Sequence, residues 1–238
     1  MSLPHKPDAF LGVLMLDTRF ARLLGDIGNP ASFDLPVRHA VVEGASPQRV
    51  VRDSDASLLS PFIDTGRALV ERGACAIATS CGFLVLFPRE LSEALPLVPV
   101  WTSCLLLLPE QQAALPPGRR VGVITIDADS LGCTRQHAAG ADPSTPIEGV
   151  APGCSLQCSL LGNLATLDEG QAARDVVAAG ARLAARCPDV AALVLECTSM
   201  PPCAAALRQA TGLPVHDITT LLDDRWRRLA AASNGHLA

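Results

Sequence analysis

The sequence predicts an α/β fold made of two similar parallel-sheet domains, related by a pseudo-two-fold duplication, with the active site in the cleft between them. Short apolar runs alternate with amphipathic segments along the 238 residues, which is typical of parallel sheets covered by helices. Three landmarks also recur in the same order at an offset of about 110 to 116 residues, far longer than the roughly 20 to 50 residues of solenoid repeats. The two observations together indicate two α/β units built alike.

The recurring landmarks are apolar runs that end in small or polar residues. They are GVLMLDT at 12–18 with GVITIDA at 122–128, the runs that end at Cys81 and Cys197, and VPVWT at 98–102 with LPVHD at 213–217. Any one pair could arise by chance between apolar strands, but three in register favour duplication. We expect residues 1–112 and a C-terminal helix at 219–238 to form the first domain, and 113–218 to form the second.

The elements follow from periodicity and from chain-breaking residues. Strands are predicted at 10–16, 37–42, 75–80, 97–101, 121–126, 146–150, 191–196 and 213–216, and helices at 54–72, 168–186 and 221–232. Pro61 fits the first of these helices only if it lies in the first turn. Residues 151–166, rich in Gly, Ser and Cys, are predicted to be a loop, which either folds over the site or is a passive connection. Residues 1–8 read as a polar tail.

Composition excludes several classes of function. The net charge of −5 gives no basis for binding nucleic acid, and no stretch reaches the roughly 18 apolar residues of a membrane span, so we expect a soluble cytoplasmic protein. The only lysine is Lys6, and no Gly-x-Gly-x-x-Gly follows a strand, which leaves pyridoxal phosphate and dinucleotides without a site. The nine cysteines show no zinc spacing. We expect no cofactor and no metal; a homo-oligomer is left open.

Cys81 and Cys197 end matching apolar runs, and ligands of open α/β sheets bind at such strand ends. Inverting a carbon acid needs a base on one face and an acid on the other, and a thiol with a pKa of about 8.5 can serve as either. Nearby helix N-termini would lower that pKa further. We therefore predict that Cys81 and Cys197 are an opposed catalytic pair acting on a small carboxylate. The alternative is that both are ordinary core cysteines.

Residues beside these cysteines are candidates for binding the substrate. Ser80, Gly82 and Thr198 flank the thiols and could donate to a carboxylate, or they could be simple turn residues. Asp17 and Thr18 end the first strand, where they could hold an amino group or a carboxylate, or only cap a helix. Glu196, next to Cys197 on an alternating strand, should point away from the thiol, which favours a structural role.

Two strand-end cysteines in duplicated halves, with a threonine directly after the second, resemble the aspartate/glutamate/hydantoin racemase superfamily over nearly the whole chain. Asp-Thr at 17–18 is similar to the Asp-Ser that ends the first strand in glutamate racemases. Gly-Phe at 82–83 replaces the Asn-Thr often found there, and CTSMP at 197–201 is closer to the Cys-x-x-Met-Pro of maleate cis–trans isomerases. Arylmalonate decarboxylases keep only the second cysteine and resemble this chain less.

This resemblance implies an isomerase that needs no cofactor, a racemase or epimerase of an amino acid or related small carboxylate in which the two cysteines transfer the protons. Two alternatives stay open. One is a maleate-type cis–trans isomerase, in which one cysteine adds covalently to the double bond. The other is a non-catalytic relative that keeps the fold and a ligand cleft.

Overall fold

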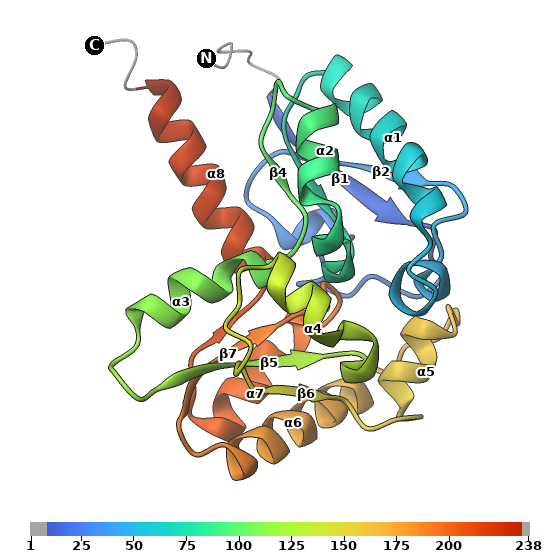
Figure 1. Ribbon diagram of the computed structural model, residues 1–238. Coiled ribbons are helices and arrows are strands. Elements are labelled where there is room, and N and C mark those ends of the chain that lie inside the picture. The colour runs from blue at the N-terminus through green and yellow to red at the C-terminus, as the bar shows by residue number, and fades with distance from the viewer. Residues whose placement is uncertain (1–8, 235–238) are drawn as a thin grey trace.

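A computed structural model describes residues 9–234, which form two four-stranded parallel sheets with helices around them (Figure 1). The predicted tail at 1–8 and the end of the predicted C-terminal helix at 235–238 lie outside the described residues. In chain order the strands are β1 (Phe10–Leu16), β2 (Val37–Val42), β3 (Ala74–Thr79), β4 (Val100–Trp101), β5 (Arg120–Thr125), β6 (Ile147–Gly149), β7 (Val190–Leu195) and β8 (Val215–His216). All eight predicted strands are present, although β4, β6 and β8 are shorter than expected.

The two sheets repeat the same topology, which confirms the predicted α/β fold with two similar halves. The first sheet has the order β2-β1-β3-β4 and the second has the order β6-β5-β7-β8, so each strand has its counterpart four strands later. The detail of the pairing repeats as well. A register shift lies between Phe10 and Leu11 where β1 pairs with β3, and another between Arg120 and Val121 where β5 pairs with β7.

Matching glycines lie in the two central strands. A Cβ at Gly12 in β1 would lie 2.8 Å from Cδ1 of Ile77, and a Cβ at Gly122 in β5 would lie 2.7 Å from Cδ2 of Leu183. Both distances are shorter than real Cβ contacts, so a larger residue at either position would force a neighbouring core side chain to shift. The recurrence of glycine at both landmarks therefore has a packing reason.

The three predicted helices are present as α1 (Leu59–Glu71), α6 (Glu169–Arg186) and α8 (Ile218–Asn234). Pro61 lies in the first turn of α1, and the Asp168 carboxylate caps α6 by accepting from the Gln171 N–H at 2.8 Å. The sequence did not predict α2 (Pro88–Ala94), α3 (Leu108–Ala114), α4 (Ala128–Ala138), α5 (Ser155–Leu161) and α7 (Ala204–Thr211). Single-turn helices occur at Pro30–Ser32, Gln48–Arg52, Ala56–Leu58, Gly82–Leu86, Cys104–Leu107 and Pro201–Cys203.

The loop prediction for 151–166 is wrong where α5 lies. The reason is tertiary, because the Asp175 carboxylate of α6 accepts from the Leu156 N–H at 2.9 Å and satisfies a donor at the start of α5. Leu156 and Leu160 are then buried beneath the helix. A short segment of mixed composition is thus held helical by its neighbours rather than by its own propensity.

Helix α8 follows β8 and contacts both that strand and the turn Cys104–Leu107 (Figure 1). Its assignment to the first domain, with residues 1–112, stays a prediction, as does the boundary of the second domain at 113–218. None of the helices within residues 9–234 is long and apolar enough to cross a lipid bilayer.

Candidate active site

A small pocket, with a cavity volume of about 40 Å³, lies where the carboxyl ends of the central strands of both sheets meet. Leu16 ends β1, and Ser80, Ile126 and Glu196 directly follow β3, β5 and β7. The wall of the pocket is formed by Leu16, Phe20, Pro47, Val51, Ser80, Cys81, Gly82, Phe83, Ile126, Leu160, Leu161, Glu196, Cys197, Thr198 and Ser199. It therefore contains five of the seven predicted site residues, namely both cysteines, Ser80, Gly82 and Thr198.

The two thiols occupy equivalent positions at the start of tight turns. Cys81 follows β3 and precedes the turn Gly82–Leu86, and Cys197 follows β7 and precedes Pro201–Cys203. In each half the backbone N–H two residues later favours the ionised thiol, that of Phe83 for Cys81 and that of Ser199 for Cys197. Both thiols are free. The duplicated backbone therefore presents two sulfur atoms to one pocket.

Both thiols are harder to ionise than an ordinary cysteine. Burial, reinforced by the nearby Glu196 carboxyl, raises the pKa of Cys81 to about 12, and the same two causes raise the pKa of Cys197 well above its usual range. The expected lowering by helix N-termini is outweighed, because a single N–H donor does not compensate for the loss of solvent around each sulfur. The arginines that oppose this shift at Cys81 are Arg135 and Arg22.

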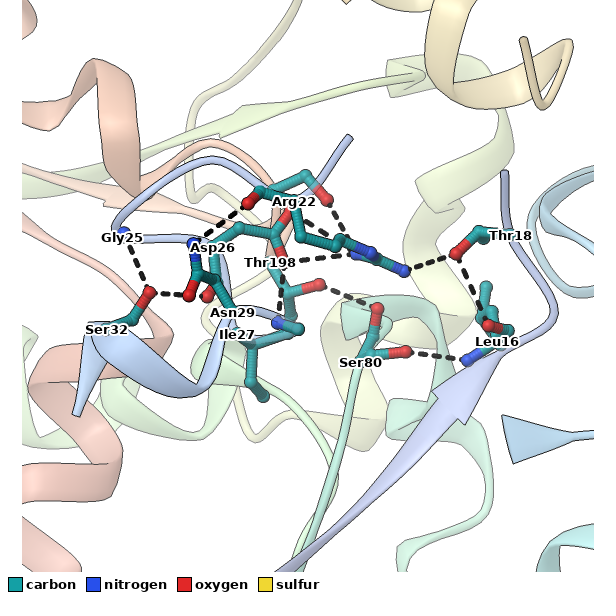
Figure 2. Close-up of polar contacts among 12 residues, drawn as sticks. Leu16, Thr18, Arg22, Gly25, Asp26, Ile27, Asn29, Ser32, Ser80 and Thr198 are labelled. Carbon is teal, nitrogen blue, oxygen red and sulfur yellow. Dashed lines mark hydrogen bonds and ion pairs between the residues drawn. The ribbon is translucent and has the colours of Figure 1, made fainter. Parts of the chain in front are cut away.

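The half-sites are joined by hydrogen bonds between the residues that flank the cysteines (Figure 2). The Thr198 hydroxyl donates to the Ser80 carbonyl at 2.7 Å, and the Ser80 hydroxyl accepts from the Leu16 N–H at 2.8 Å. The Thr198 carbonyl accepts from the Ile27 N–H at 3.3 Å. These side chains fix the distance between the turns, so their hydroxyl groups are engaged within the protein.

Asp17 and Thr18 lie beside the pocket rather than in its wall. Asp17 is exposed, and its carbonyl accepts from Nδ2 of Asn163 at 3.2 Å. The Thr18 hydroxyl accepts from Nη2 of Arg22 at 2.6 Å, and Nη1 of the same arginine donates to the hydroxyl of Ser199 and to Asp26 (Figure 2). Thr18 thus reaches the second half-site through Arg22, and a direct substrate contact by this pair stays a prediction.

Sequence reasoning undervalued Glu196. Its side chain is fully buried, and Oε2 accepts from the Thr125 hydroxyl at 2.8 Å. A Cβ built on Gly82 would lie only 2.3 Å from its Oε1, so the carboxyl packs against the turn that carries Cys81. The expectation that Glu196 points away assumed a strand, but β7 ends at Leu195 and alternation no longer applies. A glutamate in a wholly apolar run was the available signal.

Helix α5 closes one side of the pocket through Leu160 and Leu161. Asn163 follows the C-terminal turn of α5 and ties this helix to the first half. Its backbone is left-handed, with φ of 50°. Its Oδ1 accepts from the Arg19 N–H at 2.7 Å, and its amide donates to the Asp17 carbonyl. Of the two readings of 151–166, the structure thus supports a segment that folds over the site.

Chemically, the pocket offers two thiols, one buried carboxyl and several apolar side chains, with backbone N–H groups at both turns. Over the described part of the chain, no group of three or more His, Cys, Asp or Glu side chains is placed to hold a metal ion. This donor set suits the removal and return of a proton at carbon.

Comparison with curated proteins finds lyases. The chain is 29% identical over 245 residues to a dimethylsulfoniopropionate lyase of Durusdinium sp. clade D, covering 92% of this chain and 75% of that protein. It is 31% identical over 227 residues to dimethylsulfoniopropionate lyase 6 of Emiliania huxleyi (strain CCMP1516), covering 88% of this chain but only 57% of the relative's length. No protein-family model matches the chain.

Comparison with solved structures identifies the fold. A variant of arylmalonate decarboxylase in a sulfate-associated form superimposes with a TM-score of 0.62 at 19% identity, covering 93% of both chains. Glutamate racemase of Francisella tularensis subsp. tularensis SCHU S4, in complex with D-glutamate, gives 0.59 at 13% identity, covering 95% of this chain and 82% of that one. The chain therefore has the fold of the aspartate/glutamate racemase superfamily, as the resemblance implied.

Proposed function

We propose that this chain is a lyase that uses a pocket cysteine to eliminate dimethyl sulfide from dimethylsulfoniopropionate or a closely similar β-sulfonio carboxylate. The observation that carries the proposal is the similarity to two lyases of this name over 88% and 92% of the chain. With so few residues left unaligned, the 92% match must span both Cys81 and Cys197. This proposal replaces the expected isomerase with a lyase on the same fold and the same pair of thiols.

The chemistry requires one base. A thiolate takes a proton from C2 of the substrate, the electron pair of that C–H bond forms the C2=C3 double bond, and the C3–S bond breaks with its electrons going to sulfur. The products are acrylate, neutral dimethyl sulfide and a protonated thiol, and one proton is released to water before the next turnover. Because the leaving group departs uncharged, it needs no acid, and the whole reaction runs on side chains without a cofactor.

The pocket suits such a substrate in polarity. Its cavity of about 40 Å³ has to open further to admit the substrate, and Phe20, Leu160 and Leu161 then offer apolar surface to the methyl groups on the sulfonium. No lysine or arginine is among the residues of its wall. We infer that the substrate carboxylate binds backbone N–H groups of the turns at Gly82 and Thr198, while the Ser80 and Thr198 hydroxyls support those turns.

A two-base racemase of a small amino acid is the second candidate, and the observation in its favour is that matching half-sites bring both thiols into the wall of one pocket. Inversion uses both thiols, one as base and one as acid, whereas elimination uses one. The two reactions therefore differ in their products and in the fate of the C2 proton.

The test is incubation of the purified chain with dimethylsulfoniopropionate in D₂O, with dimethyl sulfide measured in the headspace and acrylate by proton NMR. We expect the two products in equal amounts. Aspartate, glutamate, hydantoins and maleate serve as comparison substrates. Deuterium at C2 of an amino acid, with no dimethyl sulfide from the first substrate, would favour the racemase; binding without either reaction would favour a non-catalytic relative.

A further inference from the structure

The carboxyl of Glu196 is buried, and its two oxygens differ in their hydrogen-bond partners. The residue is fully buried; Oε2 accepts from the Thr125 hydroxyl, and the nearby Ile126 N–H favours the ionised carboxyl. Among the described residues, Oε1 has no hydrogen-bond partner. A buried carboxylate oxygen without a donor is costly, whereas a protonated one needs no further charge compensation. The structure therefore leaves a place for a proton at Oε1.

This oxygen lies between the turns that carry the two thiols. Glu196 immediately precedes Cys197 in the chain, and its Oε1 packs against Gly82, which immediately follows Cys81. Of the residues that form the pocket wall, Glu196 is the one with an ionisable carboxyl. It is the acid common to both half-sites.

Few charges face this carboxyl. Arg135 of α4 places its guanidinium 4.8 Å from the centre of the Phe83 ring and donates to the Ser130 carbonyl and to the Ser54 hydroxyl. Its Nε has no partner within the described chain, and its positive charge favours ionised Glu196 and Cys81. The third thiol nearby, Cys104, donates to the Glu196 carbonyl at 3.2 Å. Glu196 thus has one buried cation nearby and three thiols around it.

The negative charges of an ionised Glu196 carboxyl and an ionised thiol repel each other. Burial raises the pKa of Glu196 to about 7, so the carboxyl changes charge near neutral pH, and its negative charge raises the pKa of Cys81 and Cys197. A thiol with a pKa of about 12 supplies little thiolate to solvent at pH 8. It can become a base only if its proton has a nearby acceptor.

We propose that Glu196 is a positioning residue that takes up the proton of a pocket thiol at Oε1 through one water molecule, since within the described chain no thiol is itself hydrogen-bonded to that oxygen, and so turns that thiol into the base of the elimination. The S–H bond breaks, the water accepts that proton and passes one of its own to Oε1, and the single negative charge moves from the carboxylate to sulfur. After elimination the thiol holds the substrate proton and Glu196 releases its own to water, so one proton leaves per turnover. The role of the thiol as the base of the elimination rests on the proposed function. The coupling between the charge of Glu196 and the ionisation of the thiols does not.

The test is Glu196→Gln, which keeps the shape of the side chain and an oxygen for the bond from Thr125. Removing the anion should speed iodoacetamide alkylation of Cys81 and Cys197 at pH 8 to 9 by about 3- to 10-fold, since one pKa unit is tenfold in thiolate. Turnover should instead fall by about 100-fold, the usual contribution of a positioned base, and lose its rise near pH 7. Glu196→Asp should restore part of that pH dependence, and Glu90→Gln, on the exposed face of α2, should change neither rate.

A purely structural role would be shown by slower turnover with an unchanged pH profile and unchanged alkylation, and that result overturns the proposal. If the unmodified chain releases no dimethyl sulfide, only the proposed function fails, because alkylation still measures the coupling. Should the glutamine variant not fold, Thr125→Val removes a donor to the ionised carboxyl and raises its pKa. Alkylation between pH 7 and 8 should then rise, and an unaltered rate would also overturn the proposal.

Discussion

The Thr198 hydroxyl donates to the Ser80 carbonyl at 2.7 Å, so the residue after one cysteine is bonded to the residue before the other. Both groups are buried, at 1% and 5% exposure. A hydrogen bond shielded from water holds its partners more rigidly than one at the surface. This bond fixes the spacing of the two thiols, since each flanking residue is one peptide unit from its cysteine.

Thr198→Val should weaken this link while keeping the shape of the side chain. The Ser80 carbonyl would lose its donor in a buried place, which costs about 1 to 3 kcal/mol of unfolding free energy. Turnover should fall more than stability accounts for, because the half-sites lose their register. Thr211→Val is the matched control, since its hydroxyl donates to the Leu207 carbonyl at 2.8 Å, on α7. Urea unfolding and initial rates measure both effects; equal losses in the two variants would contradict the role of the link.

Gly82→Ala should damage the site through a steric clash. A Cβ would lie 2.3 Å from Oε1 of Glu196 and 2.5 Å from the carbonyl of the same residue, and this backbone carbonyl cannot move without shifting the chain at the end of β7. We expect a loss of about 1 to 3 kcal/mol in stability, as for other overpacked cores, and a severe loss of turnover. Gly170→Ala is the control, because its Cβ would meet nothing closer than 3.5 Å at the start of α6, where alanine favours the helix. Thermal unfolding and initial rates of both variants test this prediction, and equal effects of the two substitutions would contradict it.

The sheets could be predicted because their strands are short apolar runs in a repeated order. The repeat also indicated that the two halves share one topology. β1 and β2 have their predicted limits, and β3, β5 and β7 are each displaced by one residue. The short helices could not be predicted, since α5 depends on a cap from Asp175 and on burial of its leucines rather than on local propensity.

The candidate site was predictable at the thiols and less so around them. Strand-end position alone indicated Cys81 and Cys197, and matching turns of the two halves then brought their neighbours together. Glu196 was expected to point away from the thiol because alternation was assumed to continue past Leu195, the last residue of β7. The Thr198–Ser80 bond joins residues 118 apart, and no pattern in the sequence marks such a pair.

Asn163→Ala should loosen helix α5 where it covers the pocket. The asparagine joins this segment to the first half through two bonds, accepting from the Arg19 N–H at 2.7 Å and donating to the Asp17 carbonyl at 3.2 Å. We expect KM to rise more than kcat falls, because Leu160 and Leu161 would cover the substrate less firmly. Asn163→Gly separates the two causes: it removes the bonds but suits the left-handed backbone, so a defect shared by both variants belongs to the bonds. Kinetics unchanged in both would contradict the covering role of α5.

The free energy of unfolding should fall as the pH rises from about 4.5 to 7. Burial raises the pKa of Glu196 to about 7, so the native state binds a proton that the unfolded state has released. The stabilisation is complete below the unfolded pKa and is lost as pH rises through 7, a difference on the order of 3 kcal/mol. Asp55, whose pKa is lowered to about 2 by Ser57 and Arg49, acts only at more acid pH. Urea unfolding at intervals from pH 4.5 to 8 should show this slope, and Glu196→Gln should reduce it; an equal slope in that variant would contradict the assignment.

Replacing each pocket cysteine by serine should distinguish one base from two. Cys81→Ser and Cys197→Ser each leave a hydroxyl too weakly acidic to replace a thiolate, so loss of the base should lower dimethyl sulfide release by at least about 100-fold. If inversion is the reaction, both variants should lose it, and each remaining thiol should exchange the α-hydrogen of opposite enantiomers in D₂O. If elimination is the reaction, the variant that lacks the base should be nearly inactive, and the other should be weakened through the neighbouring turn. Cys158→Ser, at an exposed thiol on α5, is the control and should keep full activity. Undiminished release from both pocket variants would mean that the thiols take no part in either reaction.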